Sequence, residues 1–133
     1  MKKKFNENKG ILFFIIDFST SKKSLFLIKF KNRIQKKYGE TLILDHDNMR
    51  KIFNLKKFSK KQRFKQNLKY ITLAKFLTNN CINVILCITN PSHEAFKLVN
   101  KQFDNYLIIT NSQNEKTIRV AWGSNGSYHK DII

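Results

Sequence analysis

Four short apolar runs set the hydrophobic pattern of this chain. They are ILFFII (11–16), TLILD (41–45), INVILCI (82–88) and NYLIIT (105–110), and they show little alternation of polar and apolar positions. Continuous apolar character over so few residues is typical of parallel strands that are covered on both faces. We therefore expect four buried strands.

An amphipathic segment that fits a helix follows the first run. This helix is expected from Ser24 to Lys37, with Gly39 just past its end, where glycine commonly stops a helix. Its apolar side is expected to consist of Leu25, Leu27, Ile28 and Ile34.

Two further helices are expected later in the chain. One begins after Ser59, a good N-cap, and its apolar side is expected to consist of Phe64, Leu68, Ile71 and Ala74. The other has Asn90 as its N-cap and Pro91 in its first turn, and it runs to about Gln102.

Strands that alternate with helices predict an α/β fold, with a parallel sheet of four or five strands and helices on both faces. The segment TIRVAW (117–122) could supply the fifth strand, whereas GSNGSYHKD (123–131) is expected to be a loose tail. The length predicts a single domain over residues 1–133. Within it we expect a basic N-terminal tail (1–9) and a divergent C-terminal segment (113–133).

The charge of the chain supports two interpretations. Lys and Arg number 26 against 9 Asp and Glu, which gives a formal net charge of +17. Such an excess favours phosphate-bearing partners. However, the lysines are spread along the whole chain among many Asn, Ile and Phe residues, which is also typical of compositional drift.

Nothing in the sequence predicts secretion or a membrane span. The start MKKK followed by ILFFII imitates a signal peptide, but the apolar run is short and leads into Asp17 and lysines. No stretch approaches the roughly 20 apolar residues of a membrane helix. Cys81 and Cys87 fit no metal or redox spacing, so we expect buried free thiols and a cytoplasmic protein.

Three polar clusters follow the expected strands, and they are DFSTSKKS (17–24), DHDNMR (45–50) and TNPSH (89–93). In an open α/β sheet, ligands bind at the carboxyl ends of the strands. One polar cluster at a strand end is ordinary, because strands lead into loops. Three clusters at the same edge, with Lys-Ser in one and two aspartates and an arginine in another, predict a ligand site.

The first cluster partly matches a phosphate-binding loop. Such a loop reads G-x-x-x-x-G-K-[S/T], and Lys23 and Ser24 supply its ending. Asp17 and Lys22 stand where the pattern has glycine. Glycine is used there because the backbone N–H groups wrap closely around a phosphate.

The second cluster carries a family resemblance. LDHDNMR (44–50) resembles the L-D-G-D-N-x-R motif of adenylylsulfate kinases, and its distance from Lys23 fits that family without a gap. FSKKQRFKQNLKYITLAKFL (58–77) resembles the family segment that contains D-R-x-E-N, and VILCITNPSH (84–93) parallels a strand that ends in S-P-Y-R. The resemblance covers residues 10–112 and implies a P-loop kinase-like fold and a place in sulfate assimilation.

The resemblance implies a kinase that uses ATP and Mg²⁺ to phosphorylate the 3′-hydroxyl of adenosine 5′-phosphosulfate or a related nucleotide. Lys23, Asp45 and Asp47 would be catalytic, and Ser24 and Asp45 would hold the metal. The implied nucleotide-binding residues are Ser19, Ser21, Lys22, Lys23 and Ser24. The implied substrate-binding residues are Asp47, Arg50, Arg63, Asn67, Asn90 and Pro91.

Departures from the family pattern leave two functions open. The phosphate loop has lost three glycines, His46 replaces the glycine of D-G-D-N, and few residues remain for the lid that covers the nucleotide in this family. The chain is therefore either an active kinase or a non-catalytic protein of the same fold, which would serve as an anion- or nucleotide-binding module or as a partner subunit. A third and weaker hypothesis is nucleic-acid binding, for which the sequence offers charge but no recognition motif. Monomer and homodimer both remain open.

Overall fold

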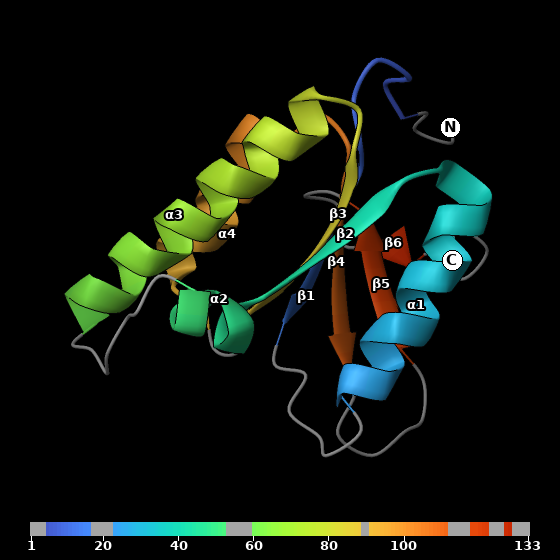
Figure 1. Ribbon diagram of the computed structural model, residues 1–133. Coiled ribbons are helices and arrows are strands. Elements are labelled where there is room, and N and C mark those ends of the chain that lie inside the picture. The colour runs from blue at the N-terminus through green and yellow to red at the C-terminus, as the bar shows by residue number, and fades with distance from the viewer. Residues whose placement is uncertain are drawn as a thin grey trace.

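A computed structural model of the chain describes residues 5–16, 23–52, 60–88, 91–111, 118–122 and 127–128 (Figure 1). The strands are β1 (Leu12–Ile16), β2 (Thr41–Asp45), β3 (Asn83–Ile88), β4 (Tyr106–Asn111), β5 (Ile118–Trp122) and β6 (Ser127–Tyr128). The helices are α1 (Lys23–Tyr38), α2 (His46–Ile52), α3 (Lys60–Asn79) and α4 (His93–Gln102).

The described strands form one sheet in the order β2-β3-β1-β4-β5-β6. β2, β3, β1 and β4 pair in parallel, whereas β5 and β6 extend the sheet as antiparallel strands next to β4. The expected α/β fold with a parallel sheet is therefore confirmed, and residues 118–122 do form a further strand. The expectation of a loose tail over 123–131 is wrong at residues 127–128, because these pair with β5.

Helices cover both faces of the sheet, as the apolar runs predicted (Figure 1). α1 packs on one face, and α3 and α4 pack on the other. Alternate residues of β1 serve the two cores: Phe14 lies in the cluster under α3 and α4, and Phe13 lies in the cluster under α1, where it meets Phe30 edge to face. This arrangement explains why β1 shows no polar alternation, since both of its faces are buried.

The helices turn different sides to the sheet than we expected. Leu27, Phe30 and Ile34 form the buried side of α1, while Leu25 and Ile28 are 53% and 55% exposed. Leu25 and Ile28 were therefore wrongly placed in the core. On α3, Ile71 and Ala74 are buried as expected, but Leu68 is exposed.

Two helix starts also differ from the prediction. α2 begins directly after β2, within the polar cluster that we expected only to end the strand. The N-cap of α4 is Ser92, whose hydroxyl accepts a hydrogen bond from the N–H of Ala95 at 3.2 Å. Pro91 thus precedes the cap instead of occupying the first turn, and the expected cap Asn90 lies outside the described residues.

The two cysteines have different environments. Cys87 is buried in β3 as expected, but Cys81 is exposed at the turn after α3. Cys81 has a φ of 64°, and its thiol donates to the carbonyl of Asn8. The prediction of two buried thiols is therefore wrong for Cys81.

The amino end of the sheet holds the segment before β1. The side-chain oxygen of Asn105 accepts a hydrogen bond of 2.6 Å from the N–H of Asn6. The side-chain nitrogen of Asn105 donates to the carbonyls of Asn6, Lys9 and Gly10. A Cβ on Gly10 would lie 2.0 Å from the carbonyl oxygen of Ile82. Residues 5–9, which we expected to belong to a basic tail, are thus bound to the fold.

None of the helices in the described part of the chain combines the length and apolar character that a membrane span requires.

Candidate functional site

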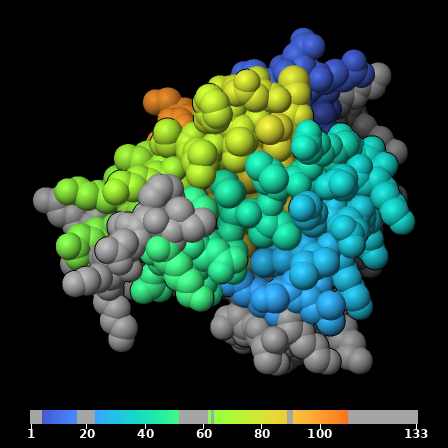
Figure 2. Space-filling model, in the orientation of Figure 1, coloured from blue at the N-terminus to red at the C-terminus, as the bar shows by residue number. Residues whose placement is uncertain are grey.

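The carboxyl ends of β1, β2 and β3 lie at one edge of the sheet. Cys87 of β3 is the register partner of Asp45 on one side and of Ile15 on the other. The elements that follow these strands therefore start close together. As a result α1 and α2 meet beside the end of β2, although their starts at Lys23 and His46 are 23 positions apart in the sequence (Figure 2).

Lys23, at the start of α1, binds two carboxylates. Its Nζ lies 2.8 Å from Oδ1 of Asp45, the last residue of β2, and 3.2 Å from Oδ2 of Asp47 in the first turn of α2. The side chains of Lys23 and Asp45 are each 12% exposed, whereas that of Asp47 is 57% exposed. Three residues that sequence reasoning assigned to catalysis thus form one cluster, which we call the Lys23 cluster.

His46 extends the Lys23 cluster. Its Nε2 lies 2.8 Å from Oδ1 of Asp47, so that Asp47 lies between a lysine and an imidazole. Burial lowers the pKa of His46, against the opposing effect of the Asp47 carboxylate. The prediction treated His46 only as a replaced glycine, and no sequence signal indicated this contact, which depends on α2 forming at that point.

The charges of the Lys23 cluster support one another. Burial disfavours the charged form of Lys23, but hydrogen bonds and ion pairs with Asp45 and Asp47 outweigh it and raise the pKa of the lysine. Burial likewise works against the carboxylate of Asp47, but the nearby His46 and Lys23 hold the pKa of Asp47 below its ordinary value. Lys23 and Asp47 are therefore both ionised at neutral pH.

The oxygen donors of the Lys23 cluster fit a magnesium ion that is shared with phosphate groups. No group of three or more His, Cys, Asp or Glu side chains that could hold a metal occurs among the described residues. Mg²⁺ is usually bound by one or two carboxylates together with substrate phosphates and waters. Asp45 and Asp47 provide such carboxylates, and the hydroxyl of Ser24 follows Lys23 at the start of α1.

α3 supplies the other side of the site. Asn67 is 3% exposed and Tyr70 is 1% exposed, and Tyr70 interacts electrostatically with Arg50 and Asp47 of α2. Neither the side-chain nitrogen of Asn67 nor the hydroxyl of Tyr70 has a hydrogen-bond partner within the described part of the chain. The sequence analysis assigned Asn67 and Arg50 to substrate binding but gave Tyr70 no role.

The structure also refines the comparison of α3 with the D-R-x-E-N motif. That motif places its asparagine three residues after its arginine, which in this chain is the position of Gln66, whereas Asn67 lies four residues after Arg63. Gln66 and Asn67 are both buried. By this spacing Gln66, and not Asn67, stands at the asparagine position of the motif.

Some of the predicted site residues cannot be placed. Ser19, Ser21, Lys22 and Asn90 lie outside the described residues, as does the side chain of Arg63, although Arg63 belongs to α3. Pro91 is half-buried just before α4.

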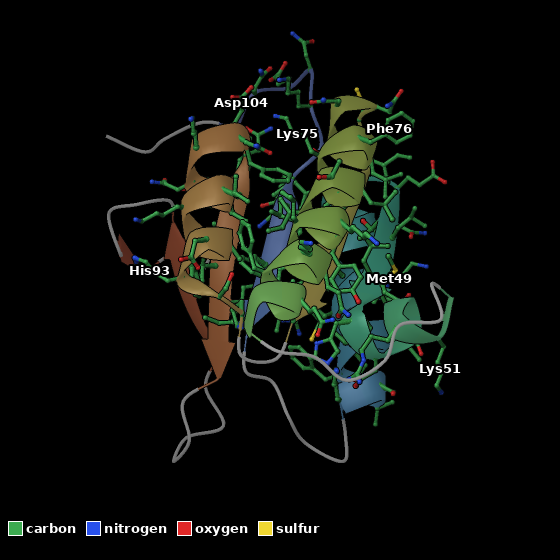
Figure 3. All side chains as sticks on the ribbon, turned by 90° about the vertical axis from the view of Figure 1, so that its left-hand side faces the viewer. Met49, Lys51, Lys75, Phe76, His93 and Asp104 are labelled. Carbon is green, nitrogen blue, oxygen red and sulfur yellow. The ribbon has the colours of Figure 1, made fainter. Side chains whose placement is uncertain are left out.

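Lys75 of α3 has a structural role. It lies at the far end of α3 from α2 (Figure 3). Its Nζ donates to the carbonyl of Gln102 and lies 5.3 Å from the ring centre of Phe103. It therefore caps the end of α4 and takes no part in the Lys23 cluster.

A family model described as adenylylsulphate kinase matches residues 9–122. The fold is similar to a structure titled "Crystal structure of APE1195", with a TM-score of 0.64 and 21% identity over 80% of this chain and 62% of that one. It is also similar to a cysteine-to-alanine mutant of the Mycobacterium tuberculosis APS kinase CysC, with a TM-score of 0.62 and 18% identity over 81% of this chain and 84% of that one. Among curated proteins, none matches the chain.

Proposed function

The chain belongs to the adenylylsulphate kinase family, and from this premise we propose that the Lys23 cluster is the centre of a phosphoryl-transfer site. The donor would be ATP with Mg²⁺. The acceptor would be the 3′-hydroxyl of adenosine 5′-phosphosulfate or of a related nucleotide.

The observation that carries this proposal is the contact of Lys23 with both Asp45 and Asp47. Phosphoryl transfer depends on positioning and on neutralising the charge of the transferred group. A charged lysine at a helix start can meet phosphate oxygens, and helix N-termini favour anions. Asp47, which is largely exposed, can accept the proton of an attacking hydroxyl.

Mg²⁺ would be held by Ser24 and Asp45, where it would neutralise phosphate charge. Lys23, which would bind the phosphate groups, is already paired with two carboxylates. A phosphate group therefore has to compete with Asp45 and Asp47 for this lysine. Together with the lost loop glycines, this competition supports slow turnover.

A second function, a nucleotide-binding module without catalysis, is favoured by a specific observation. Asp17 and Lys22 occupy positions at which the phosphate loop uses glycine. An aspartate there places a negative charge near the phosphates, and both side chains restrict the backbone conformations that a glycine allows.

One experiment separates the two functions. Binding of ATP with Mg²⁺ and of adenosine 5′-phosphosulfate is measured by calorimetry, and phosphate transfer is followed with labelled ATP. The protein is compared with Lys23→Ala and with Lys36→Ala, a control that removes an exposed lysine at the other end of α1.

For the kinase we expect slow transfer that Lys23→Ala abolishes and Lys36→Ala leaves unchanged. Binding without transfer would establish the module instead. If neither nucleotide binds, both functions are wrong.

A further inference from the structure

Two buried polar atoms on α3 are unsatisfied by any residue in the part of the chain that the structure describes. They are the side-chain nitrogen of Asn67 and the hydroxyl of Tyr70, and neither has a hydrogen-bond partner among the described residues. A buried donor without a partner is costly, and such groups in native proteins call for an explanation. A phenylalanine would fill the volume of Tyr70 without this cost, so the hydroxyl itself needs a reason.

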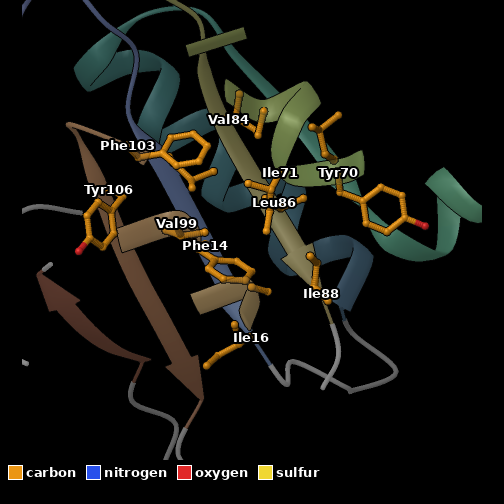
Figure 4. Close-up of a cluster of buried hydrophobic side chains, with 14 of the residues drawn as sticks. Phe14, Ile16, Tyr70, Ile71, Val84, Leu86, Ile88, Val99, Phe103 and Tyr106 are labelled. Carbon is orange, nitrogen blue, oxygen red and sulfur yellow. The ribbon is translucent and has the colours of Figure 1, made fainter. Parts of the chain in front are cut away.

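Both groups lie beside the candidate site. Asn67 and Tyr70 are three residues apart in one helix, so their side chains emerge on the same side of α3. Figure 4 shows the ring of Tyr70 pointing away from the centre of the apolar cluster to which it belongs. Its hydroxyl interacts electrostatically with Arg50 and Asp47 of α2.

The chemistry of these groups indicates what they bind. The Asn67 nitrogen can only donate, and burial raises the pKa of Tyr70, so that its phenol keeps its proton at neutral pH and can donate as well. Arg50 adds a positive charge nearby. Two neutral donors and a guanidinium suit an oxyanion.

We propose that Tyr70 and Asn67 bind a phosphate or sulfate oxygen of the acceptor nucleotide, which makes Tyr70 a specificity-determining residue of this chain. The inference rests on the proposed function for the identity of the ligand. It goes beyond it by assigning a neutral hydroxyl donor, in addition to Arg50, to the acceptor.

The structure offers a matched pair of tyrosines for the test. Tyr70 and Tyr106 are both buried, at 1% and 5% exposure, but the hydroxyl of Tyr106 donates to the side-chain oxygen of Asn100. Tyr70→Phe and Tyr106→Phe therefore remove the same atom, in one case from an unpartnered site and in the other from a satisfied one.

Each variant is measured for its melting temperature without ligand and for its affinity for adenosine 5′-phosphosulfate, AMP and ATP. Tyr70→Phe should keep or raise the melting temperature and weaken binding of the acceptor by roughly tenfold or more, as expected for a lost hydrogen bond to a charged group. Tyr106→Phe should lower the melting temperature and keep the affinity. ATP affinity should be the same in all three proteins.

Adenosine 5′-phosphosulfate and AMP differ in the sulfate group, so comparing them shows which group of the acceptor the Tyr70 hydroxyl contacts. A loss seen with both adenosine 5′-phosphosulfate and AMP assigns the contact to the phosphate, and a loss seen only with the former assigns it to the sulfate. If Tyr70→Phe binds the acceptor as tightly as the unchanged protein, or melts as early as Tyr106→Phe, the hydroxyl is structural and the inference is wrong.

Absence of acceptor binding in the unchanged protein also overturns the inference. Failure of the proposed function is a separate result. It would appear as acceptor binding that depends on Tyr70 in a protein that does not bind ATP.

Discussion

Lys23 Nζ lies 2.8 Å from Asp45 Oδ1, and this contact joins the first residue of α1 to the last residue of β2. The carboxylate of Asp45 also accepts a long hydrogen bond, 3.5 Å, from the N–H of Asp47 at the start of α2. One side chain at the end of a strand thus fixes the starts of two helices. The charge of Lys23 consequently matters for stability as well as for ligand binding.

Replacement of Lys23 by methionine keeps most of the side-chain stem but leaves Asp45 without its counter-charge. We expect the free energy of unfolding to fall by about 1–3 kcal/mol, as for a largely buried charged acceptor that loses its partner. Urea unfolding measures this loss, with Lys36→Met as the control for removal of an exposed lysine. Equal effects in the two variants would show that the ion pairs contribute nothing.

Stability should depend on pH through the Lys23 cluster. The lowered pKa of Asp47 gives a contribution that is complete above the unfolded value, about 3.9, and lost as the pH falls through the folded value. The raised pKa of Lys23 gives a contribution that is complete below about 10.4 and lost as the pH rises through the folded value. His46, whose pKa is lowered, destabilises the fold once the unfolded chain takes up its proton below about 6.5.

The urea midpoint should therefore be highest between about pH 7 and 9. It should fall in two stages on acidification. His46→Gln should remove the first stage, which begins below about pH 6.5, and leave the second. A midpoint that falls equally in both proteins between pH 7 and 5 would contradict this assignment.

Two glycines offer a contrast between steric contact and backbone strain. Gly10→Ala places a Cβ 2.0 Å from the carbonyl oxygen of Ile82. Because both residues lie in backbone that leads into strands and cannot easily move apart, we expect the free energy of unfolding to fall by about 3 kcal/mol or more. Gly39→Ala meets no atom within 4 Å but retains a φ of +101°, for which we expect a loss of about 1–2 kcal/mol. Thermal unfolding of both variants should show the larger effect at Gly10, and the reverse order would refute the close approach.

The amide of Asn105 should be irreplaceable by a carboxylate. Asn105→Asp keeps an acceptor for the N–H of Asn6 but turns a negative oxygen toward the carbonyls of Asn6, Lys9 and Gly10. We expect Asn105→Asp to be at least as destabilising as Asn105→Ala, with faster hydrogen exchange at Asn6 in both. An aspartate variant as stable as the unchanged protein would show that these donor bonds are unimportant.

Two isoleucines of α1 test which side of the helix is buried. Ile34 is fully buried and Ile28 is 55% exposed. Ile34→Ala should cost about 2–5 kcal/mol, whereas Ile28→Ala should stay within about 0.5 kcal/mol. Comparable losses would mean that α1 presents both sides to other surfaces.

β1 and β3 could be predicted from the sequence, because strands buried on both faces are apolar throughout. β2 was expected to be buried as well, but it lies at the edge of the sheet and its Leu42 is 39% exposed. The buried side of α1 could not be predicted, since Leu25 and Ile28 are as apolar as Leu27 and Ile34. The burial of Leu27 and Ile34 and the contact of Phe30 with Phe13 show which stripe faces the sheet. Local pattern identifies an element, but tertiary packing decides its orientation.

The candidate site, like the fold, could be predicted only in part. Lys23, Asp45 and Asp47 could be found because polar residues at parallel strand ends meet at one edge, and the family resemblance assigned their roles. The contact of His46 with Asp47 and the unpartnered hydroxyl of Tyr70 could not be found, because both depend on where α2 lies relative to α3. Such relationships have no signature in residue spacing.

The position of β1 has a consequence for synthesis. This strand is made first, yet both of its neighbours, β3 and β4, come much later in the chain. The hydrogen bonds at its start, from Ile11 to Asn83 and from Asn6 to Asn105, span 72 and 99 positions. The entirely apolar β1 therefore stays unpaired until β3 and β4 have been synthesised, and we expect the nascent chain to fold slowly and to be prone to aggregation during synthesis.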